Sequence, residues 1–312
     1  MDVPLLTRVV LAGLTVSLAA ASLAAARTRG GSTGPPRPDT PLWRDDALIT
    51  GDGARLPMIS WQPSQPPKAI ILGLHGYGDY RRAFRLAGPW FAERGIALYA
   101  YDQRGFGETE SRGSWPGAAD LIEDLAEAIM VLRDRHPGLP LVVLGESMGG
   151  SVALAGLGQG RITDVDQLIL AAPAVRGQVP LRDLHDLALR LGALALPWLV
   201  VALRRGASPW LDPGEAARLA DDPLILRHIS VGSYDGLIAL ADQASADPEV
   251  ALPPTLLLYG ELDATIPGVA IDDLISRLEG ATTIRYPHRH HLLLHELDAQ
   301  PVFADCLAWI EP

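Results

Sequence analysis

A serine between two glycines is the residue of this sequence best suited to nucleophilic chemistry. Ser147 lies in the pentapeptide Gly145–Gly149 (GESMG), which follows the apolar run 141–144. This order of strand, tight turn and helix is typical of a nucleophile elbow, in which a sharply turned serine projects above a sheet. A helix starting near Met148 would point its amides and the positive end of its dipole at the same place. We therefore interpret Ser147 as a nucleophile rather than as part of a glycine-rich turn without catalytic role.

A serine hydroxyl is a weak nucleophile and needs a neighbouring base. Four of the eight histidines fall in the loop after the strand-like run 282–286, where an imidazole can come back over the serine. Composition alone does not choose among them, and a metal cluster is the competing interpretation. We disfavour a metal, because no carboxylate or thiolate shares a recognisable ligand spacing with these histidines. The four candidates are His288, His290, His291 and His295.

The imidazole in turn needs a carboxylate that orients it and stabilises its charged form. Asp263 lies in the loop after the strand-like run 255–259, which should face the histidine loop. Glu261 in the same loop is the rival, and Asp272 is a more distant alternative. Asp263 falls between Ser147 and the histidines, which is the order nucleophile, acid, histidine of the G-x-S-x-G hydrolases.

An ester attacked by the serine passes through an oxyanion, which backbone amides stabilise. The turn 75–78 (HGYG) directly follows the strand-like run 68–74, and we expect Tyr77 to offer one amide there. Met148, next to the nucleophile, would offer the second. His75 could be mistaken for a base, but we interpret it as a residue that braces the turn.

The segment 101–109 (YDQRGFGET) is a further polar stretch after a strand-like run. We expect Asp102 and Arg104 to pair or to hydrogen-bond in a way that shapes the neighbouring loops. This is a structural interpretation and assigns them no chemistry.

Short apolar runs rich in β-branched residues alternate with helical patterns after residue 42, which predicts an α/β fold with a mostly parallel central sheet flanked by helices. Chemistry in such sheets gathers at the carboxyl ends of the strands, where all the segments above fall. The expected strands are 68–74, 96–101, 141–144, 167–170, 255–259 and 282–286, and the expected helices lie near 81–94, 118–135 and 148–157.

The alternation breaks between about 176 and 250. This part is Leu-rich, contains a run with few charges over 181–205 and shows no convincing strand. We interpret it as a helical cap inserted before the penultimate strands of a domain that covers 42–312. Its leucines fit both ordinary packing of extra helices and a surface that contacts lipid, and the two are compatible.

The N-terminus differs from the rest of the chain. Residues 9–26 are uncharged, apolar and Ala-rich, so segment 1–26 is expected to be a signal peptide or a membrane anchor. Arginines flank the run on both sides and do not fix its orientation. Residues 27–41, rich in Gly, Pro, Ser and Thr from 30 onwards, read as a flexible linker. The protein is therefore expected to be membrane-associated or exported, with a cytoplasmic location not excluded.

Composition excludes some classes of binding partner and of covalent cross-link. The formal net charge of −11 and the lack of a dense basic run argue against nucleic acid, whose phosphates need clustered Lys and Arg. The single cysteine, Cys306, permits no intramolecular disulfide and lies in an amphipathic final helix, where we expect it buried.

Taken together, these motifs resemble the monoacylglycerol lipase and lysophospholipase-like branch of the α/β-hydrolases, often grouped with the serine aminopeptidases. The resemblance covers about 42–310 and implies hydrolysis of carboxylic esters through an acyl-enzyme, without a cofactor. It also selects His291 as the base through the pattern H-x-L-x-x-E. Glu146 departs from it, since many relatives carry His there. The motifs are HGxG at 75–78, D-x-R-G-x-G at 102–107, GESMGG at 145–150, G-x-x-D at 260–263, H-x-L-x-x-E at 291–296 and the cap segment 222–227.

The leading hypothesis is thus a serine ester hydrolase for monoacylglycerol-like or lysophospholipid-like substrates, with Ser147, Asp263 and His291 as the catalytic residues. The cap and residues 9–26 would provide membrane association. A serine aminopeptidase and a catalytically inactive, membrane-tethered binding protein are the alternatives. A dehalogenase or an epoxide hydrolase is disfavoured, because these chemistries need a carboxylate where Ser147 stands.

Overall fold

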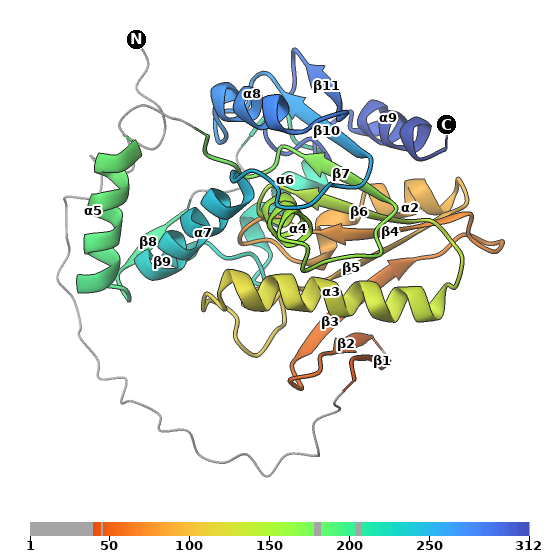
Figure 1. Cartoon of the computed structure of the whole chain (residues 1–312), viewed down its shortest axis with the longest axis horizontal. Coiled ribbons are helices and arrows are strands. Elements are labelled where there is room, and N and C mark those ends of the chain that lie inside the picture. The colour runs from red at the N-terminus through yellow and green to blue at the C-terminus, as the bar shows by residue number, and fades with distance from the viewer. Residues whose placement is uncertain (1–39, 45, 178–181, 204–207, 312) are drawn as a thin grey trace.

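A nine-stranded sheet forms the centre of the computed structural model, which describes residues 40–44, 46–177, 182–203 and 208–311 (Figure 1). Its strand order is β1-β2-β3-β5-β4-β6-β7-β10-β11. The pairs from β5 to β11 are parallel, whereas β1, β2 and β3 add antiparallel pairs at one edge. The strands are β1 Leu42–Arg44, β2 Ala47–Ile49, β3 Arg55–Trp61, β4 Ala69–Leu74, β5 Ile96–Tyr101, β6 Leu141–Glu146, β7 Gln167–Ala171, β10 Thr255–Gly260 and β11 Thr282–Tyr286.

Helices cover both faces of this sheet (Figure 1). Side chains alternate between the faces along a strand, and β4 shows this: Ile70 and Leu72 join the core under α3 and α4, while Ile71 joins the core under α2 and α9. Both faces of these strands are buried, which explains why their sequences are nearly uninterrupted apolar runs. The helices outside the cap are η1 Arg81–Phe84, α2 Ala87–Ala92, α3 Ala118–Arg135, α4 Met148–Gly158, α8 Gly268–Arg277 and α9 Gln300–Ile310.

The six expected strands and the mostly parallel, helix-flanked sheet are confirmed. The expected helix at 81–94 is wrong as a single element, because the 3₁₀ turn η1 and the helix α2 replace it. Pro89 has no amide to donate to the carbonyl of Arg85 and clashes with it, so a continuous helix cannot pass this point. The three antiparallel edge strands were not expected.

In its described residues, the stretch between β7 and β10 holds three helices, α5 Arg182–Ala195, α6 Pro213–Asp221 and α7 Val231–Ala244. It also holds a short antiparallel pair, β8 Val200–Ala202 with β9 His228–Ser230, so the expectation of no strand there was wrong. Strands of three residues are too short to show a periodic pattern. Figure 1 shows α5 at the outer side of this stretch, beside β8, β9 and α7.

Among the described residues, no helix is long and apolar enough to cross a membrane. The segment 1–26 and nearly all of the linker 27–41 lie outside the described part. Cys306 is buried in α9, and burial raises the pKa of its thiol to about 12, as expected of a structural cysteine.

Candidate active site

The serine elbow forms where β6 ends and α4 begins. Ser147 has φ 51°, a left-handed conformation that non-glycine residues rarely adopt and that costs free energy. The flanking glycines make the turn possible: a Cβ on Gly149 would lie 2.2 Å from the carbonyl oxygen of Leu74, and a Cβ on Gly145 would lie 2.6 Å from the nitrogen of Gly150. Backbone strain at a half-buried serine in a turn of this kind is typical of a functional site.

Three loops at the carboxyl ends of β6, β10 and β11 bring Ser147, Asp263 and His291 together. His291 Nε2 lies 3.0 Å from Ser147 Oγ, and His291 Nδ1 lies 2.7 Å from Asp263 Oδ2. In the neutral imidazole, Nδ1 therefore donates to the carboxylate and Nε2 accepts from the hydroxyl. The two backbone amides of Thr265 and Ile266 donate to Asp263 Oδ1 at 2.7 and 3.0 Å, which fixes the orientation of the carboxylate.

The rival residues lie elsewhere. Glu261 is exposed, and Asp272 pairs with Arg285 on the surface. The other three histidines of the loop take three different positions, so the four do not converge on one point. His288 is exposed, His290 stacks on Trp210 with 3.8 Å between ring centroids, and His295 is fully buried.

The turn 75–78 lies against the elbow. A Cβ on Gly76 would be 3.4 Å from Ser147 Cβ. Tyr77 follows, and its hydroxyl shares a hydrogen bond of 2.7 Å with Ser233 Oγ on α7. The amide of Leu226 donates to the carbonyl oxygen of Gly78 at 2.9 Å. The stretch between β7 and β10 therefore contacts the turn that lies next to the serine.

His75 braces this turn through both ring nitrogens. Nδ1 donates to the carbonyl oxygen of Gly76 at 2.9 Å, and Nε2 accepts from the amide of Gln103 at 3.0 Å. The Gln103 side chain also donates to the carbonyl oxygen of His75 at 2.8 Å. Burial lowers the pKa of His75, which keeps it neutral as these two bonds require.

Asp102 and Arg104 shape different loops and do not pair with each other. Asp102 binds the Arg81 guanidinium at 2.5 Å and accepts from the amide of Glu108 at 2.8 Å. Arg104 instead joins Asp124 on α3 to Asp52 in the turn after β2, at 2.6 and 2.7 Å. Both residues thus stabilise loop positions, as expected, but through partners distant in the sequence.

Comparison with known proteins identifies the family of this chain. Residues 65–298 match the family described as serine aminopeptidase, S33. The chain belongs to this family. It is an α/β-hydrolase of the branch that includes the monoacylglycerol lipases, and an enzyme of the lipase and esterase type.

Two relatives and one solved structure illustrate the likeness. The monoacylglycerol lipase of Mycolicibacterium smegmatis is 27% identical over 265 residues, which cover 83% of this chain and 93% of the relative. The mouse monoglyceride lipase is 26% identical, over 80% of this chain and 84% of its own. The crystal structure of a soluble variant of the Saccharomyces cerevisiae monoglyceride lipase superposes with a TM-score of 0.71 at 20% identity, covering 83% of this chain and 92% of that one.

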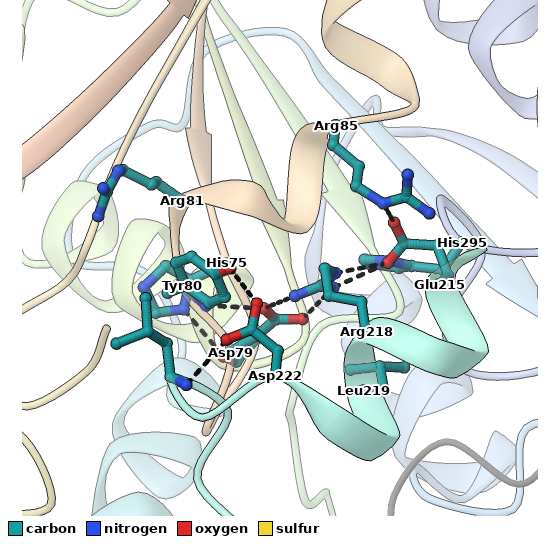
Figure 2. Close-up of polar contacts among 12 residues, drawn as sticks. His75, Asp79, Tyr80, Arg81, Arg85, Glu215, Arg218, Leu219, Asp222 and His295 are labelled. Carbon is teal, nitrogen blue, oxygen red and sulfur yellow. Dashed lines mark hydrogen bonds and ion pairs between the residues drawn. The ribbon is translucent and has the colours of Figure 1, made fainter. Parts of the chain in front are cut away.

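One feature of this hydrolase was not predicted from the sequence, a buried chain of charged side chains that begins next to the elbow. Figure 2 shows four of its members, His295, Glu215, Arg218 and Asp79. Glu146 Oε2 lies 2.9 Å from His295 Nε2, and His295 Nδ1 lies 2.9 Å from Glu215 Oε2 on α6. Arg218, one helical turn further on, donates to Glu215 at 2.8 Å and to both oxygens of Asp79 at 2.6 and 2.8 Å. We call these five residues the ion chain.

His295 is charged in this arrangement. A neutral imidazole has one donor, so only the charged form donates to carboxylates on both sides. Burial acts to lower the pKa of His295, but attraction to Glu146 and hydrogen bonds to Glu146 and Glu215 outweigh it and raise the pKa to about 10. Attraction to Arg218 and to His295 likewise outweighs burial at the acids and lowers the pKa of Asp79 and of Glu215 to about 2.

The raised pKa of His295 predicts that stability falls with rising pH. The folded protein keeps this proton up to about pH 10, whereas the unfolded chain loses it near pH 6.5, so folding takes up a proton between these values. We expect the free energy of unfolding to fall by about 1.4 kcal/mol per pH unit from this group between pH 7.5 and 9. Urea unfolding at a series of pH values measures the slope; a slope near zero over that interval would contradict a charged His295.

Proposed function

We propose that this hydrolase cleaves monoacylglycerol-like or lysophospholipid-like esters through an acyl-enzyme on Ser147. The observation that carries the proposal is the pair of hydrogen bonds Ser147–His291 and His291–Asp263, at 3.0 and 2.7 Å. Nucleophile, base and orienting acid are within reach of one another before any substrate binds.

In the proposed reaction His291 Nε2 takes the proton of Ser147 as Oγ attacks the ester carbonyl carbon. The tetrahedral intermediate collapses, the C–O bond to the alcohol breaks, and the alcohol leaves with the proton from His291. Water, deprotonated by the same imidazole, then attacks the acyl group and releases the fatty acid and the serine. Asp263 stabilises the imidazolium in both halves without itself being protonated.

The backbone amides of Tyr77 and Met148 are proposed to hold the oxyanion. Met148 is the first residue of α4, and a helix N-terminus directs its amides outward with a partial positive charge. The Tyr77 turn lies against the serine, as the Gly76 contact shows, and contacts with Ser233 and with Gln103 hold it in place. Loss of one such donor costs about 100- to 1,000-fold in kcat in other serine hydrolases.

An exposed apolar surface between β7 and β10 supports a lipid substrate. Leu187, Leu191 and Leu194 share one face of α5 at helical spacing, and Leu194 is 82% exposed. Trp198 follows, 69% exposed, with Leu196, Leu199 and Val200 beside it in the sequence. An apolar surface of this kind is typical of a site that contacts a membrane or a protein. We propose that it contacts the lipid aggregate from which the acyl chain enters, alone or together with residues 9–26.

The double variant Leu191→Glu with Trp198→Glu should separate interfacial from soluble substrates. We expect turnover of a long-chain monoacylglycerol presented in vesicles to fall at least about 10-fold, because two charges oppose burial in the lipid interface. Hydrolysis of a water-soluble nitrophenyl butyrate should change less than about 2-fold. Met130→Glu on α3, where Met130 is 54% exposed, is the matched control and should leave both rates unchanged. Equal losses on both substrates would contradict a lipid-contacting role.

Substrate profiling tests the function itself. Purified protein is supplied with monoacylglycerols and lysophospholipids of increasing acyl length, with nitrophenyl esters and with aminoacyl nitroanilides. The proposal expects ester turnover that is highest for single-chain lipid esters. Turnover of the nitroanilides alone would assign the aminopeptidase reaction instead, and no turnover of any substrate by folded protein would leave the binding role.

A further inference from the structure

The ion chain touches each of the three segments that carry the proposed chemistry. Glu146 directly precedes Ser147 in the elbow, and His295 lies four residues after His291 in the same loop. At the other end, Asp79 directly follows the turn 75–78 (Figure 2). The middle members, Glu215 and Arg218, belong to α6. One buried network therefore connects the elbow, the histidine loop and the oxyanion turn to a helix of the stretch between β7 and β10.

Backbone hydrogen bonds reinforce the connection around His295. The carbonyl oxygen of His295 accepts from the amide of Asp212, the N-cap residue of α6, at 2.9 Å. The amide of Leu297 donates to the carbonyl oxygen of Trp210 at 2.9 Å. The histidine loop and the segment that leads into α6 are thus paired on both sides of residue 296, where Leu211 and Glu296 form an antiparallel bridge.

The charges in the ion chain alternate in sign. His295 and Arg218 are cations between the carboxylates of Glu146, Glu215 and Asp79, and Arg85 adds a third cation on Glu215 from a half-exposed position. Asp212, the N-cap residue of α6, pairs with Arg85 at 3.3 Å, and the buried His75 lies close enough to Glu146 and Asp79 to interact with both carboxylates. The ion chain itself thus holds two cations and three carboxylates, and the part-exposed Arg85 supplies a third cation. Loss of the proton from His295 would leave two buried carboxylates facing a neutral ring that can donate to only one of them.

A buried ion pair in itself often does no more than hold a fold together, and its replacement by apolar residues can be neutral. Two features favour a catalytic connection here. The ion chain has members in or next to all three catalytic segments, and Glu146 leads directly into the strained Ser147 while its carboxylate binds His295. Orientation errors of about 1 Å at a catalytic group cost on the order of 100-fold in rate.

We propose that Glu146, His295 and Glu215 are positioning residues for the ester hydrolysis, and that the charged form of His295 keeps the His291 loop in register with the elbow. The proposal rests on the proposed function of Ser147 and His291. It adds that a second histidine, which touches no reacting atom, must hold its proton for turnover to reach its full rate.

Glu146→Gln tests this with the least change in shape. Glutamine retains the volume and an oxygen that accepts from His295 Nε2, but the charge is gone, so the pKa of His295 falls. The wild type should show a flat kcat between about pH 7.5 and 9, because His295 stays charged there. In the variant kcat should fall about 10-fold over the same interval as His295 loses its proton, while KM changes less than 2-fold. Glu215→Gln, on the other side of the ring, should give the same alkaline loss.

Asp124→Asn is the matched control. Asp124 is also a buried carboxylate in an ion pair, with Arg104, but it lies on α3 away from the ion chain. The control should lower the free energy of unfolding by a comparable amount and leave the shape of the pH profile as in the wild type. If Glu146→Gln and Glu215→Gln merely destabilise the fold and their profiles run parallel to that of the wild type, the positioning role is overturned.

Proton NMR of the wild type gives a readout independent of activity. Two ring N–H protons of His295, assigned by their loss in His295→Gln, should persist far downfield from pH 7 to 9 because both bind carboxylates in a buried site. Detection of one ring N–H signal instead of two, or loss of one of the two signals below pH 8, would contradict a charged His295. Failure of the proposed function would give a different result, because the wild-type protein itself would then hydrolyse no ester. The positioning role would be overturned together with that function.

Discussion

Ser147→Ala should lower kcat for ester hydrolysis by on the order of 10⁶-fold, the loss found when the nucleophilic serine of a serine protease is removed. The variant lacks the hydroxyl oxygen that lies 3.0 Å from His291 Nε2, so no acyl-enzyme can form at residue 147. The fold should remain intact, because the methyl group retains the Cβ of the elbow. Initial rates with a nitrophenyl ester, together with the far-UV circular dichroism spectrum, measure both expectations.

Ser64→Ala is the matched control for this variant. Ser64 is an exposed serine in the connection between β3 and β4, and its loss should leave kcat unchanged. A Ser147→Ala protein that retains more than about 1% of the wild-type kcat would show that another group attacks the ester.

Asp263→Asn should lower kcat about 10⁴-fold with little change in KM. The amide nitrogen of asparagine donates to His291 Nδ1 in place of the present acceptor at 2.7 Å, so the proton moves to Nε2, which then cannot take the proton of Ser147. Volume and shape are retained, and the loss reports the protonation of the ring rather than a collapse of the loop. Steady-state kinetics at pH 8 measure it.

Glu261→Gln and Asp272→Asn make this prediction specific, since both are acids of the same region that sequence alone could not dismiss. Glu261 is exposed and Asp272 pairs with Arg285, so neither change should alter kcat by more than about 2-fold. A severe loss in Glu261→Gln together with a mild one in Asp263→Asn would transfer the role of the acid to Glu261.

The parallel part of the sheet could be predicted because its strands are buried on both faces. Such strands appear as runs of apolar, β-branched residues, and β4, β5, β6 and β10 are buried along their whole length. Edge strands β1 and β2 have three residues each, and β8 and β9 are equally short, so their pairing depends on tertiary context that no local pattern carries. Pro89, near the start of α2, indicates the break between η1 and α2, but the helical spacing of apolar residues over 81–94 led to the prediction of one helix.

The candidate triad could be predicted in part for a different reason. Residues that follow successive parallel strands meet at one sheet edge, so position and the elbow motif indicated Ser147 and favoured Asp263, with Glu261 of the same loop left as a rival. His291 could not be separated from three neighbouring histidines without the family pattern; the structure places it within hydrogen-bond distance of both partners, and its catalytic role stays a prediction.

The ion chain was not predicted from the sequence, although two of its members, Glu146 and His295, lie in recognised motifs. Glu146 attracted notice only because many relatives carry His at that position, and His295 was one of four candidate bases. Their partner Glu215 lies 69 or more residues away from either in the chain, in a stretch with no recognised pattern. A lone buried acid in an apolar elbow is a sequence signal for such a partner, because a carboxylate is rarely buried unpaired.

Trapping the acyl-enzyme tests the central claim most directly. The protein is mixed with a long-chain nitrophenyl ester, quenched with acid within the first turnovers, and digested for mass spectrometry. We expect a mass increase equal to one acyl group on the peptide that contains Ser147, and no such adduct in the Ser147→Ala protein. Turnover without any adduct on that peptide, or an adduct on another residue, would contradict an acyl-enzyme on Ser147.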